Sequence, residues 1–509
     1  MSTDPVGTDP VSADPVSADP VHTPVLGDAA MAVVRSPITK IVGFLVCVEL
    51  ASGVLQGYYT PIFTDIARHL SIKDADVNWF EAAQLIVSAL VVPLLARLGD
   101  LIGHRKVLLL STVVTAVASW GVAFAPTFGT FLVAWALQGF YVVWLPMEVA
   151  IIHRRTRGEE SRVRGAAGLL VAGLEVGVIV GALTSGALAE SLGMTALLAL
   201  PAVVVTLALV AIWFGVEESP ALASGSIDWR GFGLITLALG LVMAGLVMLR
   251  VLGPGSAWPW VLVVAGALAF VPFARVELAH PEPLVDLRIL GGRGQWPVQA
   301  TAFLFGVSVL GAQIPLSTFA RTDPAVTGYG LGASAGKVSI IIGAYVLSLA
   351  AGALLLHLVG RRTGTRVAMV GAAVLVAIGY LLFLPFHGSL AQTLTNMVIA
   401  GLGSGALVAG LPAAAAAAAP PTHTGLTTGM TNTTKTIGGA FASSVFAIAL
   451  ASTGSVDSEA TAHASLGGYL VVWAICGVTA AVAAVFLAVV HATEVHGNAA
   501  AARIRTPRA

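Results

Sequence analysis

The sequence predicts an all-α integral membrane protein with fourteen transmembrane helices, and three observations predict it. Of the 509 residues, 57% are hydrophobic and only 10% are charged, and the mean hydropathy is +0.90. A soluble chain carries roughly 25% charged residues. The charges are also unevenly spread, and long stretches such as 107–147 and 367–434 contain none. Each stretch holds runs of about 20 apolar residues, the length that crosses a bilayer.

Fourteen apolar segments follow one another after residue 40. They are rich in Gly and Ala, which suits close helix packing in lipid. A lipid-facing β-barrel would alternate polar and apolar residues in short strands, and these runs do not alternate. The predicted segments span residues 41–63, 77–97, 107–125, 128–152, 164–188, 194–215, 231–249, 258–274, 296–319, 336–359, 367–386, 389–412, 426–451 and 467–490.

The chain begins with a repeated five-residue unit built on Asp-Pro-Val, in residues 3–22. Proline at every fifth position prevents a regular helix, and the segment has no apolar face to bury. We therefore expect residues 1–39 to form a disordered tail. It lacks the basic start and apolar centre of a signal peptide, and Met31 is an alternative start.

The distribution of Lys and Arg predicts the orientation in the membrane. With a cytoplasmic N-terminus, 21 of the 26 basic residues fall on the cytoplasmic side, Lys435 among them. Cytoplasmic loops of membrane proteins are enriched in Lys and Arg. An even number of helices then places both termini in the cytoplasm, and we expect the cell (plasma) membrane as the location.

Several function classes find no support in the sequence. The formal net charge is zero, so nothing indicates a nucleic-acid partner. The histidines and the cysteines Cys47 and Cys476 do not have metal-ligand spacing. The chain has no Gly-rich phosphate loop ending in Lys-Ser/Thr, which argues against ATP as the energy source. We therefore expect no enzyme activity, no cofactor and no metal. We also expect the protein to be a monomer in the lipid bilayer.

The loop after the second segment, Leu95–Lys106, reads LARLGDLIGHRK and resembles the signature loop of the major facilitator superfamily. Its glycines permit a tight turn, and its acid can pair with a basic group or a helix N-terminus. The resemblance implies a loop that latches the two halves of the protein in the outward-facing state. The latch residues would be Gly99, Asp100, Gly103, Arg105 and Lys106. Ala96 stands where the family usually has glycine.

Shorter matches resemble the fourteen-helix drug:proton antiporter (multidrug efflux) branch of that superfamily. They lie, in the family's order, at residues 137–139, 227–229, 283–288, 327–330, 429–433 and 438–440. The resemblance implies the major facilitator fold, with two six-helix bundles and alternating access around a central cavity. The implied division is a tail at 1–39, a bundle at 40–216, a linker with inserted helices 7 and 8 at 217–290, a second bundle at 291–492 and a cytoplasmic tail at 493–509.

The chain departs from that branch at positions linked to coupling. Trp135 replaces an arginine that the family usually carries in helix 4. Helix 5 has Ala182 and Ser185 and lacks the family's proline. The second-half counterpart of the signature loop, residues 358–365, has no acid. These departures leave the coupling mechanism open.

Three acids fall inside predicted membrane segments: Glu49, Glu148 and Glu175. A charged group at membrane depth is costly and usually faces a cavity or a partner. We expect proton coupling or substrate binding from these residues. The alternative is a structural acid that ties helices together, and Glu148 could pair with Arg154 or Arg155.

Small residues recur every fourth position along helix 5, which predicts a face for close packing. Glu175 lies two residues from that seam, about 200° around the helix. It should therefore face the cavity or the other helices of the first bundle. The seam consists of Gly173, Gly177, Gly181 and Ser185.

Polar and aromatic residues at cavity depth are candidates for substrate contact. Lipophilic substrates, including cationic ones, suit a cavity with aromatic rings and a few carboxylates. The candidates are Gln56, Tyr58, Tyr59, Trp135, Gln138, Trp144, Gln313 and Asn396.

Three hypotheses for function remain. The leading one is proton-driven export of a lipophilic small molecule such as an antibiotic. The second is a facilitator for uptake or metabolite export with different coupling, which the departures in helices 4 and 5 favour. The third is a membrane sensor or scaffold that transports nothing.

Overall fold

The computed structural model describes residues 38–156, 160–217, 227–281, 283–419, 424–452 and 463–505, and every regular element in these ranges is a helix. The expected disordered tail falls almost wholly outside the described residues. Within these ranges, thirteen helical stretches are long and apolar enough to cross a membrane, and α16 is a shorter apolar helix. They coincide with the fourteen predicted apolar segments.

The first half of the chain supplies six of these stretches. Two of them are interrupted by short 3-10 turns, after Tyr58 and after Gln138. The elements are α1 (Ile38–Tyr58), η1 (Thr60–Ile62) and α2 (Phe63–His69); η2 (Asp74–Val77) and α3 (Asn78–Ile102); α4 (His104–Ala123); α5 (Phe128–Gln138), η3 (Gly139–Val143) and α6 (Trp144–Arg155); α7 (Glu160–Leu188); and α8 (Met194–Gly215).

The remaining stretches comprise a helical hairpin and six further helical stretches. The hairpin is α9 (Trp229–Leu252) and α10 (Ala257–Ala279), followed by the short α11 (Leu287–Leu290). The rest are α12 (Trp296–Val309) with α13 (Gln313–Arg321), the short α14 (Pro324–Thr327), α15 (Ala335–Thr363), α16 (Thr365–Leu381), α17 (Leu390–Ala417), α18 (Thr424–Ser452) and α19 (Leu466–Arg505).

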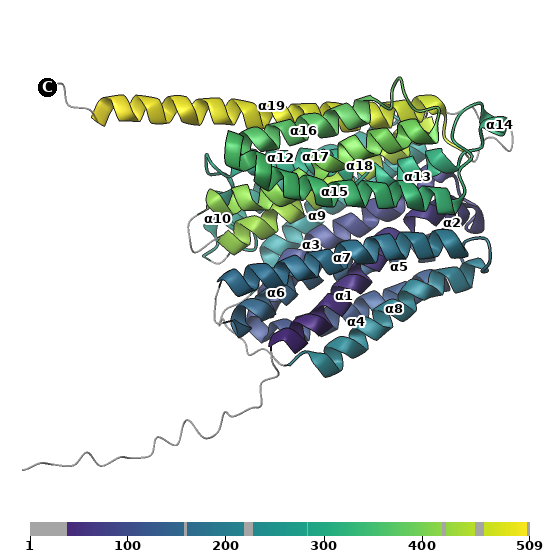
Figure 1. Ribbon diagram of the computed structural model, residues 1–509, viewed down its shortest axis with the longest axis horizontal. Helices are drawn as coiled ribbons and strands as arrows, with labels where there is room; N and C mark the ends of the chain where they lie inside the picture. Colours follow the sequence, from purple (N-terminus) through teal and green to yellow (C-terminus); the bar gives the residue numbers. More distant parts are fainter. Residues whose placement is uncertain are drawn as a thin grey trace, which may run out of the picture. The chain divides into compact units, whose positions relative to one another are not determined.

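The helices form two groups with matching internal packing (Figure 1). In the first group α1 packs on α7, and α4 packs on α8. In the second group the corresponding pairs are α12 with α18 and α16 with α19. Each group has its own large cluster of buried apolar side chains. The two halves of the chain therefore repeat one packing scheme.

A seam between the two groups is crossed by two helix pairs, α3 with α18 and α7 with α15. Within the second pair, the Ser339 hydroxyl donates to the Ala182 carbonyl oxygen at 2.6 Å. The α9–α10 hairpin packs along α18 and α3, the helices of the other crossing pair. The inserted hairpin thus lies beside the seam.

Glycines let α7 approach α1 closely. A Cβ at Gly177 would collide with the Leu50 carbonyl oxygen, and one at Gly181 would lie 3.0 Å from the Val54 Cα. Ser185 is buried and its hydroxyl donates to the Ala182 carbonyl oxygen at 3.1 Å. Small residues are what allow helix backbones to meet in lipid, where hydrophobicity does not drive association.

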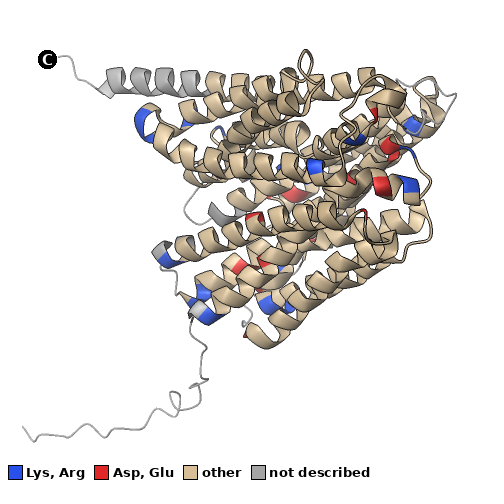
Figure 2. Ribbon diagram, turned by 45° about the vertical axis from the view of Figure 1, so that its right-hand side comes forward, with Lys and Arg blue, Asp and Glu red and all other residues tan. Residues whose placement is uncertain are grey.

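One expectation from the sequence is wrong. Lys435 is counted among the cytoplasmic basic residues, but it lies eight residues inside the apolar span Thr427–Ala451. Helix α19 continues to Arg505, into the residues expected as the C-terminal tail. Figure 2 shows most Lys and Arg at the two ends of the helices and few charges between them.

We predict that Gly177→Ala destabilises the protein, because the new Cβ must push α1 away from α7. Overpacking of this kind costs about 1–3 kcal/mol. The matched control is Gly168→Ala on the same helix, where a Cβ meets nothing within 4 Å. Thermal unfolding in detergent, followed by size-exclusion fluorescence, should show a lower midpoint for Gly177→Ala alone. Equal midpoints would contradict the packing.

Candidate functional site

Two of the three membrane acids, Glu49 on α1 and Glu148 on α6, are brought together inside the first group. Both side chains are 0% exposed. The two carboxyls are neighbours whose charges act on each other, and Ser52 is beside Glu49. None of their four oxygens has a hydrogen bond from a described residue. The sequence points to both acids but gives no sign that they meet.

Two neighbouring carboxyls buried away from water repel each other when both are ionised, so such a pair favours keeping one proton. The proton belongs to the pair rather than to either residue. Of the partners considered for Glu148, Arg155 instead binds Glu217 at 2.7 Å. The arrangement is therefore a buried pair of acids on two packed helices.

Most of the aromatic and amide candidates lie within helix packing in this conformation. The Gln138 amide donates to the Tyr59 hydroxyl at 3.1 Å and to Ser119 at 3.0 Å. The Trp135 ring stacks edge-on against Tyr59, with centroids 4.5 Å apart. These contacts join α4 and α5 to Tyr59, the residue between α1 and η1.

Three further candidates also take part in helix packing. The Tyr58 hydroxyl donates to the Leu197 carbonyl oxygen at 2.8 Å. The Asn396 amide donates to the Phe386 carbonyl oxygen at 2.8 Å. Trp144 is fully buried. Each is a packing residue in this conformation.

Gln56 and Gln313, in contrast, are exposed. Gln56 is in the last turn of α1 and its amide donates to Ser52 at 3.4 Å. Gln313 begins α13, directly after α12, the helix that takes the place of α1 in the second group. Exposed amides at membrane depth are better solvated in a polar space between helices than in lipid.

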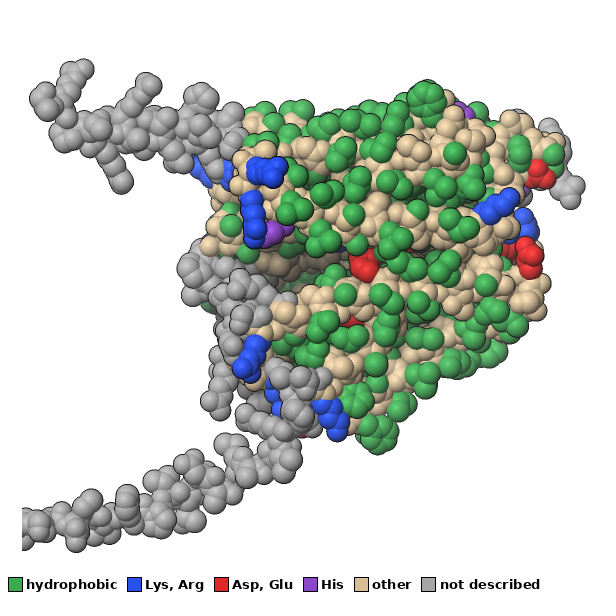
Figure 3. Space-filling view, viewed as in Figure 1, with side chains coloured by type: hydrophobic (Ala, Val, Ile, Leu, Met, Phe, Trp, Pro, Cys, Tyr) green, Lys and Arg blue, Asp and Glu red, His purple; other side chains and the backbone are tan. Residues whose placement is uncertain are grey.

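Glu175, the third acid, lies on the side of α7 that meets the second group. Val178 and Ile179, one turn further along, pack against the apolar cluster of that group. Ala182, another turn along, accepts the hydrogen bond from Ser339. Glu175 is partly exposed. Figure 3 shows the seam hollowed between the two groups, with acidic surface inside it.

Lys435 on α18 is a candidate residue that the sequence-based predictions miss. It is near enough to Glu175 for the two charges to act on each other. A signal is present in the sequence, since Lys435 lies well inside an apolar run, but the positive-inside rule alone assigns it to a loop. The hydroxyl of Tyr345 on α15 is near the same acid.

At one end of the seam, which we call the gate end, charged and polar groups join the two halves. One guanidinium nitrogen of Arg321 on α13 lies 2.7 and 2.9 Å from the two carboxylate oxygens of Asp65 on α2. The Ser317 hydroxyl donates to the Thr60 carbonyl oxygen. These contacts join residues more than 250 positions apart in the chain, so no local pattern could predict them.

A second ion pair at the gate end depends on pH. His463, just before α19, lies 2.7 Å from the Asp74 carboxylate on η2. The hydrogen bond to Asp74 raises the pKa of His463. The charged pair therefore exists where Asp74 is ionised and His463 is still protonated, and it is lost as the pH rises through the raised pKa of His463.

The signature loop lies at the opposite end, between α3 and α4. Gly103 makes the turn with a φ of 105°, a conformation that favours glycine. Asp100 pairs with His104 at 3.4 Å, and Arg105 donates to the Trp213 carbonyl oxygen at 2.9 Å. Both contacts stay within the first group. Gly99 packs beside His104, and Lys106 is exposed.

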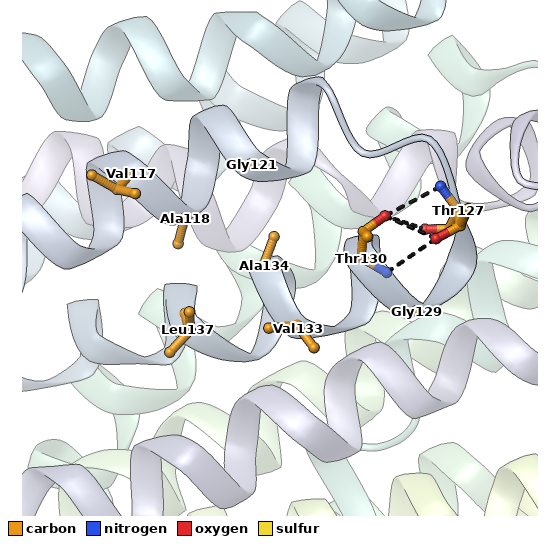
Figure 4. A pocket seen from close by; sticks show the side chains of 9 residues that line it. All are labelled: Val117, Ala118, Gly121, Thr127, Gly129, Thr130, Val133, Ala134 and Leu137. Atoms are coloured by element: carbon orange, nitrogen blue, oxygen red, sulfur yellow. Dashed lines mark hydrogen bonds between the residues drawn. The ribbon is translucent and has the colours of Figure 1, made fainter.

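A pocket of about 630 Å³ lies elsewhere, between α4 and α5 (Figure 4). Its walls are apolar, and Val117 and Val133 are more than 60% exposed. Its hydroxyls belong to Thr127 and Thr130, which bond to each other in a capping box at the start of α5. It carries no group suited to proton or charge chemistry.

We predict that Arg321→Met opens the gate end. Loss of a charge-assisted contact costs about 1.5–3 kcal/mol, so we expect at least about tenfold faster thiol labelling of a cysteine introduced at Gln313. Cys47 and Cys476 are first replaced by serine and alanine. The control is Arg68→Met, because the exposed Arg68 contacts the same Asp65 from within α2. Equal labelling rates would refute the gate.

The chain matches the family model of the Major Facilitator Superfamily over residues 45–228 and 298–508. Among solved structures, the nucleoside transporter NupG superposes with a TM-score of 0.61 at 12% identity, covering 89% of this chain and 98% of that one. The peptide transporter PepTSo gives 0.61 at 14% identity, covering 90% and 98%. At these identities, the two similarities show that this chain shares the fold of those transporters.

The names of curated relatives refer to different compounds. A uridine/deoxyuridine transporter of Lactococcus lactis is 25% identical over 60% of this chain and 64% of its own length. A probable actinorhodin transporter of Streptomyces coelicolor is 25% identical over 71% and 63%. This chain therefore covers just under two thirds of each. A puromycin resistance protein of Streptomyces alboniger is 26% identical over 84% and 85%.

The match to the family model covers most of the chain, including both six-helix groups. An enzyme is accordingly set aside, and membership of this family favours transport over a sensor or scaffold. The chain belongs to the major facilitator superfamily.

Proposed function

We propose that this protein exports small, largely lipophilic molecules by proton-coupled alternating access. In this proposal all fourteen apolar helices cross the cell membrane, with both termini cytoplasmic. The bundles 40–216 and 291–492 rock against each other, and the inserted hairpin stays beside the seam. The gate end faces outward. The observation that carries the proposal is the buried pair of Glu49 and Glu148.

The position of the pair suggests how a proton is coupled to the gate. Glu49 is on α1, and α1 leads through η1 directly into α2. Thr60 and Asp65 on these elements bind the second bundle through α13. When the pair loses its proton, repulsion between the carboxylates pushes α1 away from α6. That movement reaches the gate contacts along one continuous stretch of chain.

Relatives support export and also supply the alternative. The puromycin resistance protein is similar over 84% of this chain, which supports export of an antibiotic-like compound. The uridine/deoxyuridine transporter favours uptake of a polar metabolite instead. Trp135, in place of the arginine usual in the drug exporters, agrees with altered coupling.

A susceptibility screen tests the proposal. A host that lacks its own drug pumps expresses the protein and is exposed to a panel of antibiotics and organic dyes. Export predicts lower accumulation of at least one compound, and proton coupling predicts that an uncoupler abolishes the difference. Higher accumulation would identify uptake, and a difference that survives the uncoupler would identify other coupling.

We predict that Glu49→Gln and Glu148→Gln each remove the uncoupler-sensitive part of export, because a pair with one amide has lost half of its proton-binding group. Cells expressing either variant should accumulate the exported compound like cells without the protein. The control is Glu190→Gln, an exposed acid that follows α7. Normal export by both pair variants, at normal protein levels, would remove the pair from the mechanism.

A further inference from the structure

The short segment η2 joins the two bundles at the gate end. Its first residue, Asp74, binds His463 of the second bundle at 2.7 Å, and its second residue, Ala75, lies in the apolar cluster of that bundle. Its last residue, Val77, lies in the apolar cluster of the first bundle. Neighbouring residues of one helical turn are therefore bound to different halves of the protein.

The inserted hairpin is tied to the same segment. A guanidinium nitrogen of Arg250, in the last turn of α9, lies 3.2 Å from a carboxylate oxygen of Asp76, the third residue of η2. The two side chains are only 27% and 23% exposed. Water and salt screen a partly buried ion pair much less than one on the surface. The segment η2 is thus the place where the hairpin and both bundles meet.

Near this ion pair the hairpin also packs against both bundles. Leu246 of α9 shares an apolar cluster with Trp79 of α3 and Ala447 of α18. The Ser444 hydroxyl of α18 donates to the Met243 sulfur of α9 at 3.5 Å. Both α9 residues lie within two turns of the ion pair. The hairpin therefore has a firm base from which to hold η2.

We propose that the inserted hairpin holds the gate end closed, with Arg250 as a positioning residue that fixes η2 through Asp76. A short 3-10 turn has poorer hydrogen-bond geometry than an α-helix, so the contact with α9 limits its movement. Asp74 and Ala75 are on the same turn, and fixing it keeps both against the second bundle. The inference rests on the proposed function only in that the gate end opens during transport.

Distances between spin labels across the gate end test this role. The labels are attached to cysteines introduced at His69, the last residue of α2, and at Val326 on α14, which are exposed positions of different bundles. Cys47 and Cys476 are first replaced by serine and alanine. Pulsed electron paramagnetic resonance of the full chain in lipid then gives a short distance for the closed gate and a longer one for the open gate. Arg250→Met should raise the ratio of long to short distances about fivefold, without moving either peak.

Further variants test whether the ion pair itself is responsible. Asp76→Asn should shift the populations as Arg250→Met does, and the two changes combined should shift them no further, because both remove one contact. Arg250→Lys keeps the charge and should stay close to the original protein. The matched control is Arg230→Met, at the exposed other end of α9, which should change nothing. Elution profiles of the purified variants check that each is folded.

The proposal is overturned if folded Arg250→Met and Asp76→Asn both keep the populations of the original protein, if their effects add, or if Arg230→Met has an equal effect. Arg321→Met separates this failure from a failure of the proposed function. If Arg321→Met favours the longer distance and Arg250→Met does not, only the role of the hairpin is refuted. If neither does, alternating access through the gate end is refuted as well.

Discussion

Lipid cannot form hydrogen bonds, and the rest of this structure depends on that constraint. Backbone groups are satisfied inside helices, so the membrane part of the described chain is entirely helical. Helices cannot be driven together by hydrophobicity in lipid, so α1 and α7 meet through glycines such as Gly177. The few ionisable groups at membrane depth must then find partners or polar space, which makes their positions informative.

Those groups occupy three kinds of place, each suited to a different task. Glu49 and Glu148 share a site inside one bundle, where a proton can be held apart from the substrate. Glu175 lies on the side of α7 that meets the second bundle, and Lys435 lies inside the apolar span of α18. Asp65 and Arg321 join the bundles at the gate end. Helix α1 carries Glu49 and leads through η1 into α2, which carries the gate-end residue Asp65.

Local patterns in the sequence predict the helices and the unusual acids but not their contacts. Hydropathy alone predicts all fourteen apolar helices, because a run of about twenty apolar residues is typical of a membrane-spanning helix. Glu49 and Glu148 stand out as isolated charges, but their contact joins residues 99 positions apart. Trp135 and Gln138 resemble cavity residues, because depth in the membrane does not reveal which side of a helix faces its neighbours. Lys435 is misplaced by the rule that assigns basic residues to cytoplasmic loops, because that rule does not consider how deep a single charge lies.

The central claim, that the Glu49–Glu148 pair holds a transferable proton, is tested most directly by infrared spectroscopy of the purified protein in lipid. Difference spectra between neutral and alkaline pH should show loss of a protonated carboxyl C=O band, and that band should be absent from the Glu49→Gln/Glu148→Gln double variant. The measurement needs no substrate and does not depend on the direction of transport. A spectrum that is the same in the double variant and in the original protein would contradict the claim.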